Sequence, residues 1–173
     1  IIAFRSDFSG NLVWKLQFGL TTRNATDGAI SSSGNDLCLS IATDSNGNIY
    51  CGGKTSSGLA DGGNLGGDDA FIMKIDSNGD IQWISQFGGT LDEQCNSLTV
   101  DSSDNVYCVG ETFSDFVEDN GSFPNNDNTD IFVIKISSSG LVQWKRQFGE
   151  NSKLISQIDN SDSSQLGRGI AMT

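Results

Sequence analysis

Carboxylates are the side chains of this 173-residue sequence best suited to acid–base or metal chemistry. The sequence holds 22 Asp and Glu against 10 Lys and Arg, and it contains no histidine. The commonest general base, the commonest metal ligand and the usual partner of a serine or cysteine nucleophile are therefore all missing. An enzyme built on this sequence would have to use carboxylates as its catalytic groups, and no residue stands out as catalytic.

Oxygen side chains alternate in two short stretches, DSNGN at 44–48 and DSNGD at 76–80. An EF-hand calcium loop has glycine at its sixth position and a bidentate glutamate at its twelfth, and both are missing here. Glycine at the fourth position instead favours a hairpin turn with positive φ. We predict no cofactor; if calcium binds, the acidic loops are favoured over these turns. Its candidate ligands are Asp68, Asp69, Asp127 and Asp130.

Fifteen of the 22 acids lie in or beside the long connections between apolar segments, where only Arg23 and Lys153 oppose them. Such an excess attracts cations or a basic partner. The alternative is that solvated, Asn- and Asp-rich connections are simply acidic. The net charge of −12 argues against nucleic acid as a partner. The residues selected as a partner or cation face are Asp61, Asp68, Asp69, Asp92, Glu93, Asp115, Glu118, Asp119, Asp127 and Asp130.

Short strands must position these side chains, because the apolar runs are brief and are separated by Gly, Ser, Asn and Asp. Three stretches share a Gly, Trp, Gln, Phe, Gly pattern that places Trp14, Trp83 and Trp144 in register. Two longer patterns also repeat: residues 38–57 align with 95–114, and residues 69–83 align with 130–144. No segment shows sustained helical periodicity, so we predict an all-β chain.

Each repeat predicts a meander of four antiparallel strands, since tight turns join the first strand to the second and the third to the fourth. Two complete units span 36–88 and 92–149. Residues 1–19 are the third and fourth strands of an earlier unit, and residues 167–173 are the first strand of a later one. Long loops are expected at 20–35 and 150–166. Alternate connections of a meander leave the same edge. The long, variable connections therefore share one edge, and this loop edge is the candidate functional site.

These units resemble the SBBP-type β-propeller repeat, in which I-x-x-D-x-x-G-N-x-Y-x-x-G-x-T is followed by D-A-F-x-x-K and then G-x-x-x-W-x-x-Q-F-G. The first complete unit matches at Ile41, Asp44, Gly47, Asn48, Tyr50, Gly53, Thr55, Asp69, Ala70, Phe71, Lys74, Gly79, Trp83, Gln86, Phe87 and Gly88. The second unit departs at Asp104 and Ile131. The resemblance implies β-propeller blades, often in a secreted or surface protein, and no catalytic residue. Two complete and two partial blades fall short of a usual ring, which predicts part of a larger propeller.

Residues that keep the repeat are expected to be structural. The tryptophans are expected to pack between blades rather than to form a sugar platform. Lys74 lies inside an apolar strand, so it needs an acidic partner, which is either Asp44 or Asp69. Lys135 of the next unit needs the equivalent residue.

The four cysteines occupy two repeat positions, Cys38 with Cys95 and Cys51 with Cys108. If the turn at 44–48 sets the register, Cys38 and Cys51 point to opposite faces of their hairpin. A disulfide within one hairpin is therefore disfavoured, and buried thiols are favoured over bridges between blades. The cysteine pattern therefore does not distinguish an oxidising from a reducing compartment.

We therefore expect a non-catalytic scaffold or interaction module of a larger extracellular or cell-surface protein, with proteins or further blades of the same or neighbouring chains as partners. The alternatives are a glycan-binding propeller and a glycoside hydrolase or lyase that uses paired carboxylates about 5–9.5 Å apart, with Glu118 as a candidate acid. Asn24 and Asn120 lie in N-glycosylation sequons. No apolar run is long enough to span a membrane, and the first residues lack a leader pattern, so a piece of a longer protein is expected.

Overall fold

The computed structural model describes residues 2–17, 21–23, 30–32, 34–60, 63–115 and 129–148. All the regular elements in these ranges are β-strands, so the all-β prediction is confirmed. Because none of these residues is helical, no membrane-spanning helix is found in the described part of the chain.

The strands form two four-stranded and two two-stranded antiparallel sheets. The central blade consists of β5 (Asp36–Thr43), β6 (Ile49–Thr55), β7 (Asp69–Ile75) and β8 (Ile81–Phe87). The C-terminal blade consists of β9 (Glu93–Val100), β10 (Val106–Thr112), β11 (Asp130–Ile136) and β12 (Val142–Phe148). The N-terminal hairpin consists of β1 (Ile2–Ser6) and β2 (Leu12–Gln17). β3 (Thr21–Arg23) and β4 (Ile30–Ser32) form a separate two-stranded ladder. Each blade is a meander in chain order, as predicted.

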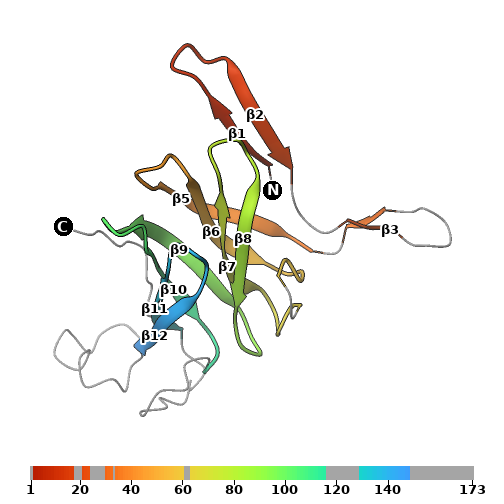
Figure 1. The fold of residues 1–173 in the computed structure, drawn as a ribbon. Coiled ribbons are helices and arrows are strands. Elements are labelled where there is room, and N and C mark those ends of the chain that lie inside the picture. The colour runs from red at the N-terminus through yellow and green to blue at the C-terminus, as the bar shows by residue number, and fades with distance from the viewer. Residues whose placement is uncertain are drawn as a thin grey trace.

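The N-terminal hairpin, the central blade and the C-terminal blade follow one another in space (Figure 1). Successive side chains of a strand point to opposite faces of its sheet, and both faces of β7 are buried. Phe71 and Met73 pack towards Trp14 of the hairpin, whereas Ala70 and Ile72 join the apolar cluster of the C-terminal blade. The core therefore lies between successive sheets, as blades of a propeller require, and the sheets stay open.

The predicted loop at 20–35 differs from the structure. It contains the β3–β4 ladder, in which Thr21 pairs with Ser32 and Arg23 with Ile30. Thr and Ile favour extended backbone, and the ladder stands apart from the blades (Figure 1). The predicted loop at 150–166 and the predicted strand at 167–173 lie outside the described residues.

The prediction against a disulfide within one hairpin was wrong. Cys38 is bonded to Cys51 and Cys95 to Cys108, each pair with its Cα atoms 5.9 Å apart. The reason is a β-bulge: the register shifts between Cys38 and Ser40, and the extra residue, Leu39, returns Cys38 to the face of Cys51.

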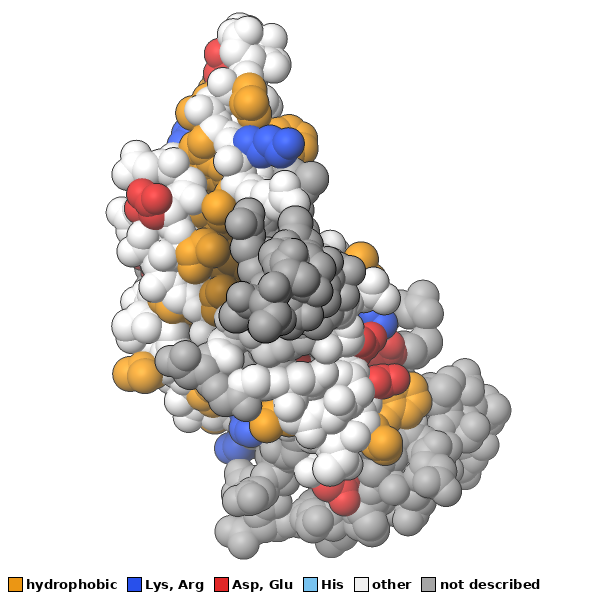
Figure 2. All heavy atoms as spheres, turned by 90° about the vertical axis from the view of Figure 1, so that its right-hand side faces the viewer, with side chains coloured by type: hydrophobic (Ala, Val, Ile, Leu, Met, Phe, Trp, Pro, Cys, Tyr) orange, Lys and Arg blue, Asp and Glu red, His pale blue; other side chains and the backbone are white. Residues whose placement is uncertain are grey.

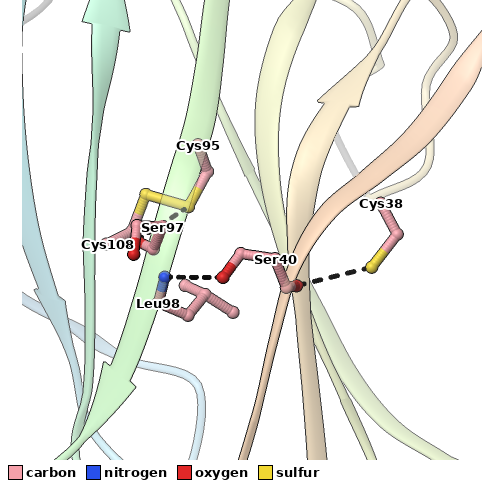
Figure 3. The surroundings of a disulfide bond; sticks show 6 residues. All are labelled: Cys38, Ser40, Cys95, Ser97, Leu98 and Cys108. Atoms are coloured by element: carbon pink, nitrogen blue, oxygen red, sulfur yellow. Dashed lines mark hydrogen bonds between the residues drawn. A yellow bond between two sulfur atoms is a disulfide. The ribbon is translucent and has the colours of Figure 1, made fainter. Parts of the chain in front are cut away.

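The same irregularity occurs in β9 and places Cys95 beside Cys108, as Figure 3 shows. Next to that disulfide, the Leu98 backbone N–H donates to Ser40 Oγ at 3.0 Å and so joins the two blades.

Candidate interaction site on the loop edge

The tight turns lie at one edge of the blades, which we call the turn edge. There the repeated polar residues already have hydrogen-bond partners. Asp44 Oδ1 accepts the backbone N–H groups of Asn46 (3.0 Å) and Asn48 (2.9 Å), and Oδ2 accepts Asn48 Nδ2 (2.7 Å) and the Tyr50 hydroxyl (3.1 Å). Lys74 Nζ lies 3.6 Å from Asp44 Oδ2 and 5.2 Å from the Tyr50 ring centroid. Burial raises the pKa of Asp44, but the hydrogen bonds from Asn48, Tyr50 and Asn46 outweigh burial and hold it below its ordinary value.

The C-terminal blade repeats this network around Asp101. Its Oδ1 accepts the backbone N–H groups of Ser103 and Asn105, both at 2.9 Å, and its Oδ2 accepts the Tyr107 hydroxyl at 3.2 Å. Lys135 Nζ lies 3.7 Å from Oδ2. Desolvation raises the pKa of Asp101, yet the hydrogen bonds from Asn105, Ser103 and Tyr107 bring it to about 2. The acidic partners of the two lysines are therefore the turn aspartates, one of the two predicted alternatives.

The long connections meet at the opposite edge, the loop edge, where three of the selected acids are buried. Asp69 is fully buried, and its Oδ2 accepts Gln86 Nε2 at 2.8 Å and the Leu65 backbone N–H at 2.9 Å. Asp130 is 4 % exposed and accepts Gln147 Nε2 at 2.8 Å. Burial raises the pKa of Asp130, and nearby Asp115 adds to the rise.

Glu93 is the third buried acid, at 1 % exposure. Its Oε1 accepts the Thr112 hydroxyl at 2.8 Å, and its Oε2 accepts the Gly89 backbone N–H at 2.6 Å. A Cβ on Gly88 would lie 2.4 Å from Asp69 Oδ1 and 2.6 Å from Glu93 Oε2, so only glycine leaves room for both carboxylates. The hydrogen bonds of these buried acids position the loops.

A cavity of about 170 Å³ opens at the loop edge between the central and C-terminal blades. It is lined by Lys54, Asp68, Asp92, Glu93, Gln94, Glu111 and Phe113. We call it the acidic pocket, because it has four carboxylates and one ammonium group. Figure 2 shows acidic side chains beside a basic one and next to an apolar patch at one margin of the molecule.

Hydrogen bonds from backbone and side-chain donors hold the acidic pocket in shape. The Asp68 N–H donates to Asp92 Oδ1 at 2.8 Å, and the Glu93 N–H donates to the Asp68 carbonyl at 2.6 Å. Lys54 Nζ donates to Asp68 Oδ2 at 2.5 Å. The connection that precedes β7 is therefore tied to the connection that precedes β9.

The structure thus gathers three of the selected residues, Asp68, Asp92 and Glu93, in one pocket. Asp115 is exposed just after β10. The other selected residues without a described position are Asp61, Glu118, Asp119 and Asp127, together with the sequon residues Asn24 and Asn120. Among the described residues, no group of three or more His, Cys, Asp or Glu is arranged to hold a metal ion. A calcium site that uses Asp127 stays a prediction.

Sequence reasoning missed four pocket residues, Lys54, Gln94, Glu111 and Phe113. The available signal was a break in the repeat: Lys54 and Glu111 occupy equivalent positions in the two units, as do Ser56 and Phe113. A charge reversal within an otherwise regular repeat marks a position that packing does not dictate.

Open antiparallel four-stranded sheets that stack through their faces define this chain as a segment of a β-propeller. The profile of the SBBP family, described as a beta-propeller repeat, matches residues 13–60 and 82–116. These two ranges are therefore similar to SBBP beta-propeller repeats. It is also 29 % identical over 128 residues to "Uncharacterized WD repeat-containing protein L264" of Acanthamoeba polyphaga mimivirus. That match covers 65 % of this chain and 8 % of the viral protein.

Proposed function

We propose that this chain is a non-catalytic interaction segment of a larger extracellular or cell-surface propeller protein, and that its acidic pocket binds a basic segment of a partner protein. The observation that carries this proposal is the pocket itself, whose lining holds four carboxylates, Asp68, Asp92, Glu93 and Glu111, and one cation, Lys54. The family match and the similarity to a WD repeat-containing protein support the coarser assignment of a propeller module.

The arrangement of the pocket favours an arginine or lysine side chain as its occupant. Glu111 Oε2 is buried and has no hydrogen-bond partner among the described residues, so an incoming N–H donor would satisfy it. Phe113 is 40 % exposed at the rim and offers an aromatic face to a cation. Asp92 is exposed and accepts only a backbone N–H within the described residues.

An oxidising compartment is part of the proposal. Disulfides persist in extracellular proteins and are rare in the cytosol. Both complete blades carry one, at the same repeat position. A disulfide that closes each hairpin supports a secreted or surface location.

The test is a binding measurement with a short peptide of alternating arginine and glycine. The same peptide with citrulline in place of arginine keeps the shape and removes the charge, so it serves as the ligand control. We expect the arginine peptide to bind and the citrulline peptide to fail. Binding should weaken as salt screens the charges.

Two variants locate the binding. Asp92→Asn and Glu111→Gln should each weaken binding of the arginine peptide by about two- to fivefold, as loss of one partly exposed charge pair does. Asp80→Asn removes an exposed charge at the turn edge and should leave binding unchanged. Equal binding of both peptides, or an equal loss with Asp80→Asn, would contradict the proposal.

A further inference from the structure

Two buried carboxylates approach each other between the central and the C-terminal blade. Asp69 begins β7 and is fully buried, and Glu93 begins β9 and is 1 % exposed. A Cβ on Gly88 would lie 2.4 Å from Asp69 Oδ1 and 2.6 Å from Glu93 Oε2. The two oxygens therefore converge on the same point, which glycine leaves free of a side chain.

One of these carboxylate oxygens has no partner. Asp69 Oδ2 accepts Gln86 Nε2 and the Leu65 N–H, and each oxygen of Glu93 accepts one donor. Asp69 Oδ1 is buried and has no hydrogen-bond donor among the described residues. Buried polar atoms without a partner are rare in folded proteins, so this oxygen, which lies beside a second carboxylate, points to a ligand.

No described lysine or arginine forms an ion pair with either carboxylate. Residues 55–134 contain a single base, Lys74, and it lies 3.6 Å from Asp44 Oδ2 at the turn edge. Lys54 pairs with Asp68 in the acidic pocket. Two neighbouring buried carboxylates without a countercharge are unfavourable, because burial removes the water that would solvate them and each repels the other. A bound cation or a proton must compensate.

The chemistry of the two converging atoms selects a hard divalent cation. Carboxylate oxygens are the ligands that calcium and magnesium prefer, and two negative charges match one divalent ion. Calcium accepts irregular coordination at about 2.3–2.6 Å, whereas magnesium demands near-ideal octahedral geometry. Because β7 and β9 fix the positions of the two side chains, calcium is the better fit.

We propose that a calcium ion binds Asp69 Oδ1 and Glu93 Oε2 and so joins the connection before β7 to the connection before β9. Glu93 also lines the acidic pocket of about 170 Å³, from which the ion would enter and draw its water ligands. Asp69 does not line that pocket. The calcium site is therefore distinct from the proposed peptide site, and peptide binding is tested separately.

A calcium titration of the whole chain, followed by NMR, tests the site without any substitution. The Gly89 and Leu65 N–H groups donate to Glu93 and Asp69, so both amide resonances should shift as calcium binds. The amide of Asn48, at the turn edge, should not move. We expect a dissociation constant of about 0.1–1 mM, as in the weak sites of extracellular modules. Unchanged Gly89 and Leu65 resonances at about 10 mM calcium would overturn the proposal.

Thermal unfolding measures how calcium stabilises the fold. At about 10 mM calcium, the unfolding temperature should rise by about 3–10 °C above its value with a chelator. Sodium chloride at the same ionic strength controls for screening. Asp69→Asn and Glu93→Gln should each lose most of the rise. The matched control is Asp36→Asn, since Asp36 occupies the position of Glu93 in the central blade and accepts the equivalent Thr55 hydroxyl. This variant should keep the rise.

The Asp69→Asn variant also separates an ion ligand from a purely structural residue. The new amide keeps an oxygen for the Leu65 N–H and places an N–H donor where the unpartnered oxygen was, beside Glu93. With chelator, the variant should therefore unfold at no lower temperature than the unchanged chain, and only in calcium should it unfold at a lower one. A proton shared by the two carboxylates would give no calcium response in any chain. That result, or a rise that survives both substitutions, contradicts the calcium site.

Discussion

The turn edge and the loop edge of the blades differ in how faithfully they keep the repeat. At the turn edge, Asp44 and Asp101 bind equivalent partners at nearly equal distances. At the loop edge, Lys54 of one unit is replaced by Glu111 of the next, and both line the same pocket. Symmetric residues thus stabilise each blade and join it to the next, while residues that break the symmetry line the acidic pocket.

Removal of a turn-edge aspartate is expected to have the largest effect on stability. Asp44→Ala leaves the Tyr50 hydroxyl and the Lys74 ammonium without their partner in largely buried positions. Loss of one member of a buried ion pair costs about 3–5 kcal/mol. We expect that decrease in the free energy of unfolding, measured in urea.

The loop-edge comparator is Asp92→Ala. Asp92 is exposed and accepts one backbone N–H from Asp68, so we expect a loss of about 1 kcal/mol. Peptide binding at the acidic pocket should weaken at the same time. If both alanine variants lose the same stability, the contrast between the two edges does not hold.

The second largest effect is expected from the disulfides. Each closes a hairpin between cysteines 13 residues apart, so Cys→Ala at both members of a pair should cost about 3 kcal/mol by the chain-entropy estimate. Cys95 and Cys108 are also fully buried, whereas Cys38 is exposed. The Cys95/Cys108 double variant should therefore unfold at lower urea than the Cys38/Cys51 double variant, and the reverse order would show that packing does not add to chain constraint.

The blade architecture could be predicted from the sequence because it depends on patterns that recur at fixed offsets. The same reasoning placed the long connections at one edge and restricted the partner of Lys74 to two aspartates, one of which the structure selects. The disulfide prediction was wrong because one extra residue changes the register. Leu39 moves the Cys38 side chain to the other face of the sheet, and no turn or propensity signal in the sequence marks that bulge.

The hydrogen bonds between blades could not be predicted from the sequence, for a different reason. The Trp83 indole was expected to pack against the next blade, and it does, but its hydrogen bond to the Ser138 carbonyl joins residues 55 positions apart. Backbone acceptors carry no sequence signature. The burial of Asp69 and Glu93 was missed in the same way, because it follows from how two connections meet rather than from their composition.

The smallest of these effects is a difference in pH dependence between the two edges. The pKa of Asp101 is about 2 in the folded chain and about 3.9 when unfolded. Its stabilising contribution is therefore complete above pH 4 and is lost as the pH falls towards 2. The pKa of Asp130 is raised, so its contribution has the opposite sign: folding is favoured when Asp130 is protonated, and that advantage is lost as the pH rises through the raised value.

Asp101→Asn should accordingly flatten the dependence of unfolding free energy on pH below 4, and Asp130→Asn should flatten it above 4. The slopes are compared rather than the absolute stabilities, because each substitution also changes hydrogen bonds that do not titrate. Urea unfolding between pH 2 and 7 measures both slopes on the same protein. If Asp101→Asn instead flattens the dependence above pH 4 and Asp130→Asn flattens it below pH 4, hydrogen bonds do not hold the turn-edge carboxylate ionised. The proposed electrostatic difference between the two edges would then be wrong.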